Sequence, residues 1–407
     1  MSVNGIGLNG NITDNNKDVI YFDNSATTRV DSRVAEAMIP YFTQIYGNPS
    51  SAHVLGREMH GCLDKARQTV AKLINCAPHE IIFMGCGTEA DNFALIQTAE
   101  LFKGKGRHII TSAIEHKAIL ETCHFLEKQG CYITYLPVNG KGMISLYDLK
   151  RAIRPDTILI SLMMANNEVG SLFPIKEAAC IAKERNILFH TDAVQAVGKI
   201  KIDTDDLGVD MLSVSGHKIY APKGIGVLFV RKELKERLTP FMHGGAQEDG
   251  LRAGTENAPY IIGIAKAAEL IMEDGYDENT RIRSLRNLFE KRVLNEIPFT
   301  VANGDPELRV PSISSITFKY IDAESVIGYL PQICCSLGSA CASDQEMASH
   351  VLTAMKLDPV DIRGTIRFSF GRFNTEEEVN RAVDLLKAGV EKLRQISPIY
   401  NQQAGSG

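Results

Sequence analysis

The chain has 407 residues, of which 44% are hydrophobic and 23% charged, and its formal net charge is -5 at pH 7. This composition is typical of an ordinary globular protein, and the slightly acidic balance lacks the basic surface that binds nucleic acid. No apolar run reaches the roughly 18 residues that a membrane-spanning helix needs. We therefore expect neither nucleic acid nor a membrane as a partner.

The cysteine count and the first residues bear on the cellular compartment. Nine cysteines without a Cys-x-x-Cys pair fit neither a disulfide framework nor a structural zinc site, which predicts reduced thiols and no resident metal. Residues 1–18 are rich in Asn, Gly and Asp and lack the apolar core of a signal peptide, so we expect a disordered leader. Together these features favour a cytoplasmic protein.

The first informative unit of the chain follows two helical patterns, at residues 31–41 and 56–74. Residues 80–84 read as a buried strand, 85–89 as a loop of small residues, and 90–101 as a helix. A strand, a small-residue loop and a helix N-terminus make an anion site, to which Thr88 would add a hydroxyl. The alternative is a tight strand-to-helix turn that Thr88 caps, and this segment taken alone favours it.

Strands and helices then alternate, which predicts a mostly parallel sheet with helices on both faces. We expect strands at residues 107–111, 132–136, 157–163, 187–192, 209–214 and 226–230, and helices at 118–129, 146–153 behind a Ser145 cap, and 176–185. Polar residues follow four strand ends, at 115–116, 166–168, 190–195 and 215–218. Ligands bind beyond the carboxyl ends of such strands. We therefore expect one converging site.

The last third of the chain reads as a smaller α+β unit after a glycine-rich segment at residues 243–257. We expect strands at 314–318, 333–336 and 365–370, helices at 323–330 and 375–393, and a loop at 338–343 that carries Cys341. A length of about 150 residues per domain suggests two or three domains, and we expect two. The large one spans residues 28–275, and the small one combines residues 1–27 with 276–407.

Three features of the sequence together suggest pyridoxal phosphate as a cofactor. Lys218 lies on the connection between two buried strands, and Asp192 ends a third strand. A lysine holds this cofactor as a Schiff base, a carboxylate keeps its pyridine nitrogen protonated, and a helix N-terminus suits its phosphate. The alternative for Asp192 is an Asx turn or a helix cap after the strand.

Ten short motifs in these segments resemble, in order, those of the cysteine desulfurases of the NifS/IscS group. They are DNSATT (23–28), YGNPSS (46–51), CGTEADN (86–92), EH (115–116), ANNE (165–168), HTDAVQ (190–195), SGHK (215–218), RAGTEN (252–257), GSAC (338–341) and IRFS (366–369). The resemblance covers the chain from about residue 20 onward. It implies the fold type I of the class V aminotransferases, with a mostly parallel seven-stranded sheet in the large domain.

The resemblance also implies a role for each matching residue. Lys218 would be the Schiff-base lysine that moves the proton at Cα, and Asp192 would pair with the pyridinium nitrogen. His116 would stack on the cofactor ring and act as an acid and base, although a lone histidine at a strand end is more often a satisfied polar residue. The remaining cofactor-binding residues would be Gly87, Thr88, Gln195, Ser215, His217 and, from a second subunit of a homodimer, Thr255. Asn167 and Arg367 would hold the substrate carboxylate.

Cys341 separates sulfur transfer from transamination. The resemblance implies that its thiolate attacks the sulfur of L-cysteine, which leaves L-alanine and a persulfide on Cys341. The sulfur would pass to an iron-sulfur scaffold of the NifU/IscU type. The sequence departs from the group's pattern at two places. Residues 346–349, which follow the Cys341 loop, read Glu-Met-Ala-Ser in place of Leu-x-Pro-Ser, and Asp249, expected at the rim of the site, is acidic where relatives often carry a basic or neutral residue.

Two other functions compete with this interpretation. A selenocysteine lyase or a small-substrate aminotransferase on the same fold would have the same cofactor residues, but an aminotransferase would not use Cys341. A catalytically silent scaffold would be expected to have lost Lys218 or Cys341, and both are present. Cys334 and Cys335, on a predicted strand, are interpreted as packing residues.

Overall fold

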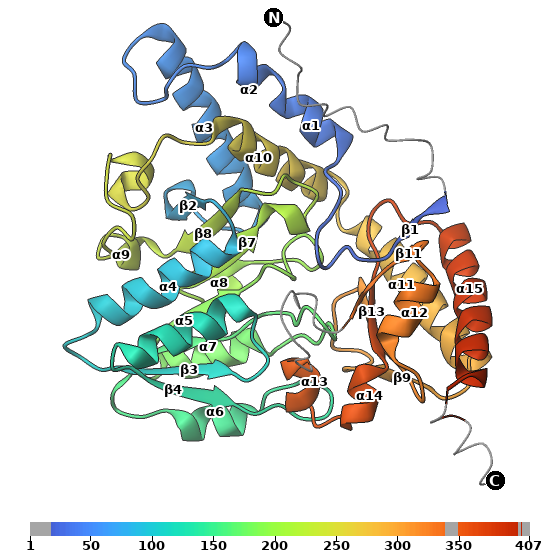
Figure 1. Ribbon diagram of the computed structural model, residues 1–407. Coiled ribbons are helices and arrows are strands. Elements are labelled where there is room, and N and C mark those ends of the chain that lie inside the picture. The colour runs from blue at the N-terminus through green and yellow to red at the C-terminus, as the bar shows by residue number, and fades with distance from the viewer. Residues whose placement is uncertain (1–17, 338–348, 398–399, 401–407) are drawn as a thin grey trace, which may run out of the picture.

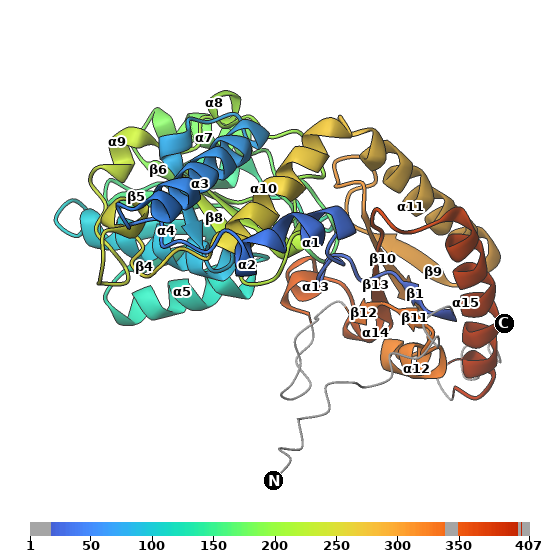
Figure 2. The same ribbon diagram turned by 90° about the horizontal axis from the view of Figure 1, so that it is seen from above.

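The computed structural model describes residues 18–337, 349–397 and 400, so the predicted leader and the Cys341 loop lie outside the described residues. The described part builds a large α/β unit and a smaller α+β unit that lie side by side (Figures 1 and 2). Their boundary coincides with a break between two long helices, where Gly275 and Tyr276 both have positive φ. We keep the division near residue 275 as a proposal.

The large unit contains a seven-stranded sheet in the order β2-β8-β7-β6-β5-β3-β4. The strands β7, β6, β5, β3 and β4 run parallel, and β8 pairs antiparallel with β7 and β2, so the predicted mostly parallel sheet is confirmed. The strands are β2 (Ile81–Met84), β3 (His108–Ser112), β4 (Tyr132–Leu136), β5 (Thr157–Ser161), β6 (Leu188–Asp192), β7 (Met211–Ser215) and β8 (Gly226–Val230). Their bounds differ from the predicted ones by at most two residues, because buried apolar runs identify strands better than their ends.

Helices cover both faces of this sheet, because alternate strand residues point to opposite sides. Ile82 and Met84 pack beneath α4 and α5, whereas Ile81 and Phe83 face α3 and α10. The helices of this unit are α1 (Ser32–Met38), α2 (Pro40–Thr43), α3 (Val54–Leu73), α4 (Gly87–Leu101), α5 (Lys117–Lys128), α6 (Leu146–Ala152), α7 (Ile175–Lys183), α8 (Thr204–Leu207), α9 (Lys232–Lys235) and α10 (Ala258–Glu273). Ser145 caps α6 as predicted, since its Oγ accepts a hydrogen bond from the Asp148 N–H at 3.2 Å.

The smaller unit has its own apolar core around an antiparallel sheet in the order β12-β13-β10-β9. Helices α11 and α15 pack together on it (Figure 2). The strands are β9 (Thr300–Asn303), β10 (Ile313–Phe318), β12 (Ser336–Leu337) and β13 (Thr365–Ser369), and the helices are α11 (Asp277–Glu296), α12 (Ala323–Tyr329), α13 (His350–Ala354), α14 (Pro359–Arg363) and α15 (Glu376–Gln395).

The strand predicted at residues 333–336 is not a single strand. Residues 333–336 form two short strands in different sheets: β11 (Ile333–Cys334) pairs with β1 (Ile20–Tyr21), and β12 pairs with β13. The apolar run does not reveal the change of partner, because each short strand has the same local pattern. As a result, the segment before residue 338 is tied both to the start of the chain and to β13.

Candidate active site

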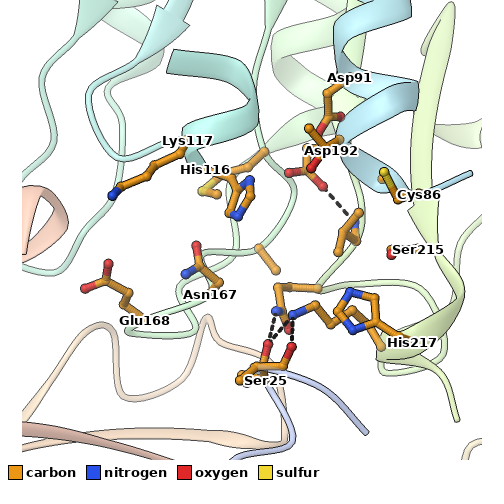
Figure 3. Close-up of a pocket in the computed structure, with 18 of the residues that line it drawn as sticks. Ser25, Cys86, Asp91, His116, Lys117, Asn167, Glu168, Asp192, Ser215 and His217 are labelled. Carbon is orange, nitrogen blue, oxygen red and sulfur yellow. Dashed lines mark hydrogen bonds between the residues drawn. The ribbon is translucent and has the colours of Figure 1, made fainter. Parts of the chain in front are cut away.

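A cavity of about 320 Å³ lies where the strands of the large sheet end and the smaller unit begins (Figure 3). Ten of the twelve predicted site residues line it: Gly87, Thr88, His116, Asn167, Asp192, Gln195, Ser215, His217, Lys218 and Arg367. Of the other two, Thr255 is exposed and does not line the cavity of its own chain, and Cys341 lies outside the described residues. Residues far apart in the sequence therefore meet in one pocket.

Lys218 ends a single 3₁₀ turn, Gly216–Lys218, that follows β7. Its Nζ donates hydrogen bonds to the carbonyl oxygens of Ser25 at 2.5 Å and Ala26 at 2.7 Å. The N–H of Ser25 donates to Oγ of Ser369 on β13 at 2.8 Å. The segment that receives the lysine is thus held by the smaller unit.

Asp192 is buried at the carboxyl end of β6, where it both forms an Asx turn and lines the cavity. Its Oδ1 accepts a hydrogen bond from the Val194 N–H at 2.9 Å. This bond forms the Asx turn that was expected as the alternative to a cofactor-binding role. The carboxyl group nevertheless lines the cavity (Figure 3). Burial raises the pKa of Asp192, and the nearby His116 and Lys218 oppose this rise.

Asp91 lies beside Asp192, and the sequence analysis did not single it out. It projects from α4 one turn after Gly87, on the same side of the helix (Figure 3). Its Oδ1 lies 3.7 Å from Nε2 of His190 and makes no hydrogen bond with any described residue. Burial and the charge of Asp192 raise the pKa of Asp91 well above its usual range. A second buried carboxyl group, whose surroundings favour its neutral form, therefore lies behind that of Asp192.

His116 is the N-cap of α5 and also a wall of the cavity. Its Nδ1 accepts a hydrogen bond from the Ala118 N–H at 3.1 Å, which leaves the proton of the neutral ring on Nε2. Burial lowers the pKa of His116, while Asp192 works in the opposite direction. A neutral imidazole is suited to lie against an aromatic ring and to exchange a proton there.

The N-terminus of α4 forms a cradle made of small residues. The N-cap is Cys86, whose Sγ accepts from the Glu89 N–H at 3.4 Å, so the alternative in which Thr88 caps the helix is wrong. A Cβ on Gly87 would lie 2.9 Å from Cγ2 of Val194 and 3.3 Å from Cβ of Ser215. Only glycine allows the helix to approach the sheet this closely. The N-terminus of α4, with the free backbone amides of its first turn, therefore lies at the cavity wall beside the hydroxyl groups of Thr88 and Ser215.

Arg367 is the buried cation on the opposite side of the cavity, with 2% of its surface exposed. Its Nη2 donates to Oδ1 of Asp23 at 2.9 Å and its Nη1 to the carbonyl oxygen of Asn167 at 3.0 Å, while Nε finds no partner among the residues that the structure describes. Asp23 also accepts from Oγ of Ser336 at 2.7 Å. The guanidinium is thus oriented by both units and retains hydrogen-bonding capacity toward an anion.

A second pair of contacts joins the start of α13 to the large unit. Oγ of Ser349 donates to Oε2 of Glu168 at 2.5 Å, and Nε2 of His350 lies 2.9 Å from the carbonyl oxygen of Glu115. Burial raises the pKa of Glu168 to about 7, although Ser349 and Arg367 act to lower it. Glu168 and His350 both line the cavity. Neither was assigned a role from the sequence, because their partners lie far away in it.

The side chains of the cavity fit pyridoxal phosphate. They offer an amine, a buried carboxylate and a small-residue helix N-terminus, and a buried Ser25 Oγ has no hydrogen-bond partner within the described ranges. The same ranges contain no cluster of three His, Cys, Asp or Glu side chains that could hold a metal ion. In those ranges, too, every helix is too short or too polar to cross a membrane.

Comparison with known proteins shows which family the chain belongs to. The family model "Aminotransferase class-V" matches residues 20–382. A "Cysteine desulfurase" of Trichormus azollae is 47% identical over 392 residues, which cover 95% of this chain and 96% of that protein. This chain is a class-V aminotransferase relative of the cysteine desulfurase type.

Solved structures agree with this membership in fold. A structure described as "NIFS-LIKE PROTEIN" superposes with a TM-score of 0.87 at 38% identity and covers 92% of this desulfurase and 100% of that chain. Another, described as "SspA in complex with cysteine", has a TM-score of 0.78 at 37% identity and covers 87% and 99%. The predicted family, fold and enzyme class are confirmed.

Of the two departures from the group's sequence pattern, the structure describes Asp249 but not residues 346–348. Asp249 has a positive φ of 57° and pairs with Nζ of Lys235 at 2.8 Å, and it does not line the cavity of its own chain. The ion pair gives a local reason for an acidic residue there. The segment Glu346-Met347-Ala348 lies outside the described residues.

Proposed function

We propose that this desulfurase converts L-cysteine to L-alanine, binds pyridoxal phosphate, and keeps the sulfur as a persulfide on Cys341. The observation that carries the proposal is the single cavity in which Lys218, Asp192, His116 and Arg367 meet. A solved relative described as a complex with cysteine supports the substrate. The proposal extends to a cytoplasmic homodimer that supplies an iron-sulfur scaffold of the NifU/IscU type.

Each part of the cofactor finds a matching group. Lys218 would hold it covalently, Asp192 would face its ring nitrogen, and His116 would lie against the ring. The phosphate would take the N-terminus of α4 and the residues around it, which are Gly87, Thr88, Ser215 and His217. Burial lowers the pKa of His217 to about 4, so this imidazole would bind as a neutral ring. Gln195 would donate to the ring oxygen.

The role that the family resemblance implies for Thr255 requires a second subunit. Thr255 is exposed on a loop and does not line the cavity of its own subunit. A second subunit could bring it to the phosphate, as the family resemblance implies. The neighbouring Arg252 is already paired with Glu89 at 3.0 Å near the start of α4, so this loop lies close to the cradle within one chain.

The bound cofactor supplies a sink for the electrons of a carbanion at the substrate Cα. Lys218 would remove the Cα proton, and the Ser25 and Ala26 carbonyls hold its amine at the cavity wall. Asn167 and Arg367 bind the substrate carboxylate and so fix which bond at Cα faces the lysine. Asp23 keeps the guanidinium in place through the 2.9 Å ion pair.

Sulfur transfer requires Cys341. Its thiolate attacks the substrate sulfur, the bond between that sulfur and the substrate Cβ breaks, and the carbon keeps the electron pair. Proton uptake at the carbon gives alanine, and the sulfur remains on Cys341 as a persulfide. The neutral ring of His116 carries the proton on Nε2 that such a step needs.

Alanine and sulfide released from L-cysteine in the presence of a thiol reductant test this function. Lys218→Ala and Cys341→Ser should each lower both products at least about a hundredfold. Cys180→Ser, at an exposed cysteine of α7, is the matched control and should retain turnover. Turnover that is independent of Cys341 would favour an aminotransferase or lyase instead. Wild-type protein that neither binds the cofactor nor releases alanine would contradict the proposal altogether.

A further inference from the structure

A continuous chain of hydrogen bonds joins two lysines behind the cavity. Nζ of Lys199 donates to Oε1 of Gln195 at 2.5 Å, and Nε2 of Gln195 donates to the carbonyl oxygen of Ser25 at 2.9 Å. The same carbonyl accepts from Nζ of Lys218 at 2.5 Å. Lys218 and Gln195 line the cavity, whereas Lys199 does not. Lys199 therefore reaches the site only through other residues.

These bonds fix the orientation of the Gln195 amide. Its oxygen is held by Lys199 and one of its N–H bonds by Ser25, so the amide has one N–H left. Because Gln195 lines the cavity, that remaining donor is available to a group bound there. A donor stabilises an anionic oxygen, and an amide turned the other way would repel it.

Lys199 also places a second positive charge near Lys218. Both lysines line a smaller cavity behind the site, together with Asp274, Glu278 and Arg372. Burial, Lys218 and Arg367 together lower the pKa of Lys199 to about 7. A positive charge there also favours an anionic oxygen on a group bound in the neighbouring cavity.

We propose that Lys199 is a positioning residue that turns the Gln195 donor toward an anionic oxygen of the bound cofactor. This inference depends on the proposed cofactor binding. Lys199 touches neither the substrate nor the reacting atoms in it. The effect of Lys199 is therefore expected in the acid-base behaviour of the site rather than in the fold.

The test compares Lys199→Met with the wild type by two measurements. The first is the pH midpoint of the visible absorbance change of bound pyridoxal phosphate, and the second is the rate at which apoprotein captures the cofactor at fixed pH. Lys199→Met should raise the midpoint by about half to one pH unit and slow capture about three- to tenfold. Lys199→Arg, which retains charge and donor, should stay close to the wild type, as should Lys201→Met at an exposed lysine nearby.

The Gln195→Leu background separates positioning from a general loss of stability. Lys199→Met should shift the midpoint less in this background than in the wild type, because the amide through which it acts is gone. Equal shifts in both backgrounds, or an unchanged midpoint and capture rate in Lys199→Met, would overturn the proposal. If Lys199→Met does not fold, Lys199→Gln must still raise the midpoint, since it lacks the charge. A wild type that never develops the absorbance would instead count against the proposed function.

Discussion

The two ends of the cavity are built in different ways. The end that fits the cofactor takes its groups from the ends of β6 and β7, which are strands of one sheet, and from the N-terminus of α4, a helix that packs on that sheet. At the other end, which fits the substrate carboxylate, Arg367 comes from β13 of the smaller sheet and Asn167 from a loop of the large unit. The first end is built mainly on one sheet, and the second depends on how two sheets meet.

This difference teaches which substitutions should separate binding of the cofactor from binding of the substrate. At the cofactor end, adjacent strands hold Asp192 and Ser213 in register, and the smaller unit contributes the Ser25 and Ala26 carbonyls that bond to Lys218. At the substrate end, Asp23 and Arg367 form an ion pair that bridges the start of the chain and β13. A change there should alter substrate use while leaving the cofactor site intact.

Replacing Arg367 by Lys should produce the largest effect and break the substrate end alone. Lysine retains the charge but not the fork that contacts both Asp23 and Asn167. We expect kcat/KM for L-cysteine to fall by about two to three orders of magnitude, which is about 3–4 kcal/mol, with little change in cofactor absorbance. Steady-state kinetics and the absorbance spectrum measure the two effects.

A buried arginine outside the cavity is the matched control for this variant. Arg286 of α11 is also buried, and its Nη1 donates to the carbonyl oxygen of Val310 at 2.9 Å. Arg286→Lys should lower the melting temperature but leave kcat/KM within about twofold. A comparable loss of kcat/KM in both variants would show that Arg367 acts only through stability.

Replacing Gly87 by Ala should have a smaller effect, confined to the cofactor end. The new Cβ would lie 2.9 Å from Cγ2 of Val194, so the helix N-terminus must move away from the sheet. We expect cofactor affinity to fall about tenfold or more, since overpacking costs about 1–3 kcal/mol. Titration of apoprotein with pyridoxal phosphate measures it, and KM for cysteine at saturating cofactor should change little.

Gly61→Ala is the control for the glycine substitution. Gly61 lies within α3, and a Cβ there would meet nothing within 4 Å. Alanine should therefore stabilise the helix by about 0.5–1 kcal/mol without changing cofactor affinity. Equal affinities in Gly87→Ala and Gly61→Ala would contradict the idea that the close approach of α4 matters.

The contrast between the two ends also explains how much the sequence could predict. Lys218, Asp192 and Ser215 follow apolar runs that identify strands, and the ends of parallel strands meet at one edge of a sheet. Their meeting could be predicted from spacing alone. Arg367 and Asn167 were assigned through family resemblance, because no periodic pattern in the chain places β13 opposite the Asn167 loop.

Other features of the site depend on contacts that no local pattern records. Asp91 lies beside Asp192, a contact between α4 and the end of β6 that no local pattern indicates, and α4 begins at Gly87, three residues earlier than predicted. Lys199 lies four residues after Gln195, outside every predicted strand and helix. The split of residues 333–336 between two sheets was missed because it is decided by partners at Ile20 and Arg367. Long-range pairing, rather than propensity, determines these features.

The smallest expected effect tests how the substrate end responds to pH. The pKa of Glu168 is raised from its usual range to about 7, chiefly by burial, so this side chain is neutral below about pH 7 and ionised above it. Its contribution to stability is therefore fully present below about pH 4.5 and lost as the pH rises through about 7. The ionised form would also attract Arg367 and compete with the substrate carboxylate.

Glu168→Gln should remove this pH dependence, because the amide keeps an acceptor for Oγ of Ser349 but does not titrate. In the wild type, KM for L-cysteine should rise about three- to fivefold more between pH 6 and pH 8 than in the variant, an effect of about 1 kcal/mol. Kinetics at several pH values measure the difference, and kcat should follow the same profile in both proteins because Lys218 and His116 are unchanged. Parallel KM profiles in the two proteins would show that Glu168 does not titrate against Arg367. In that case the two ends of the cavity would differ in architecture but not in their response to protons.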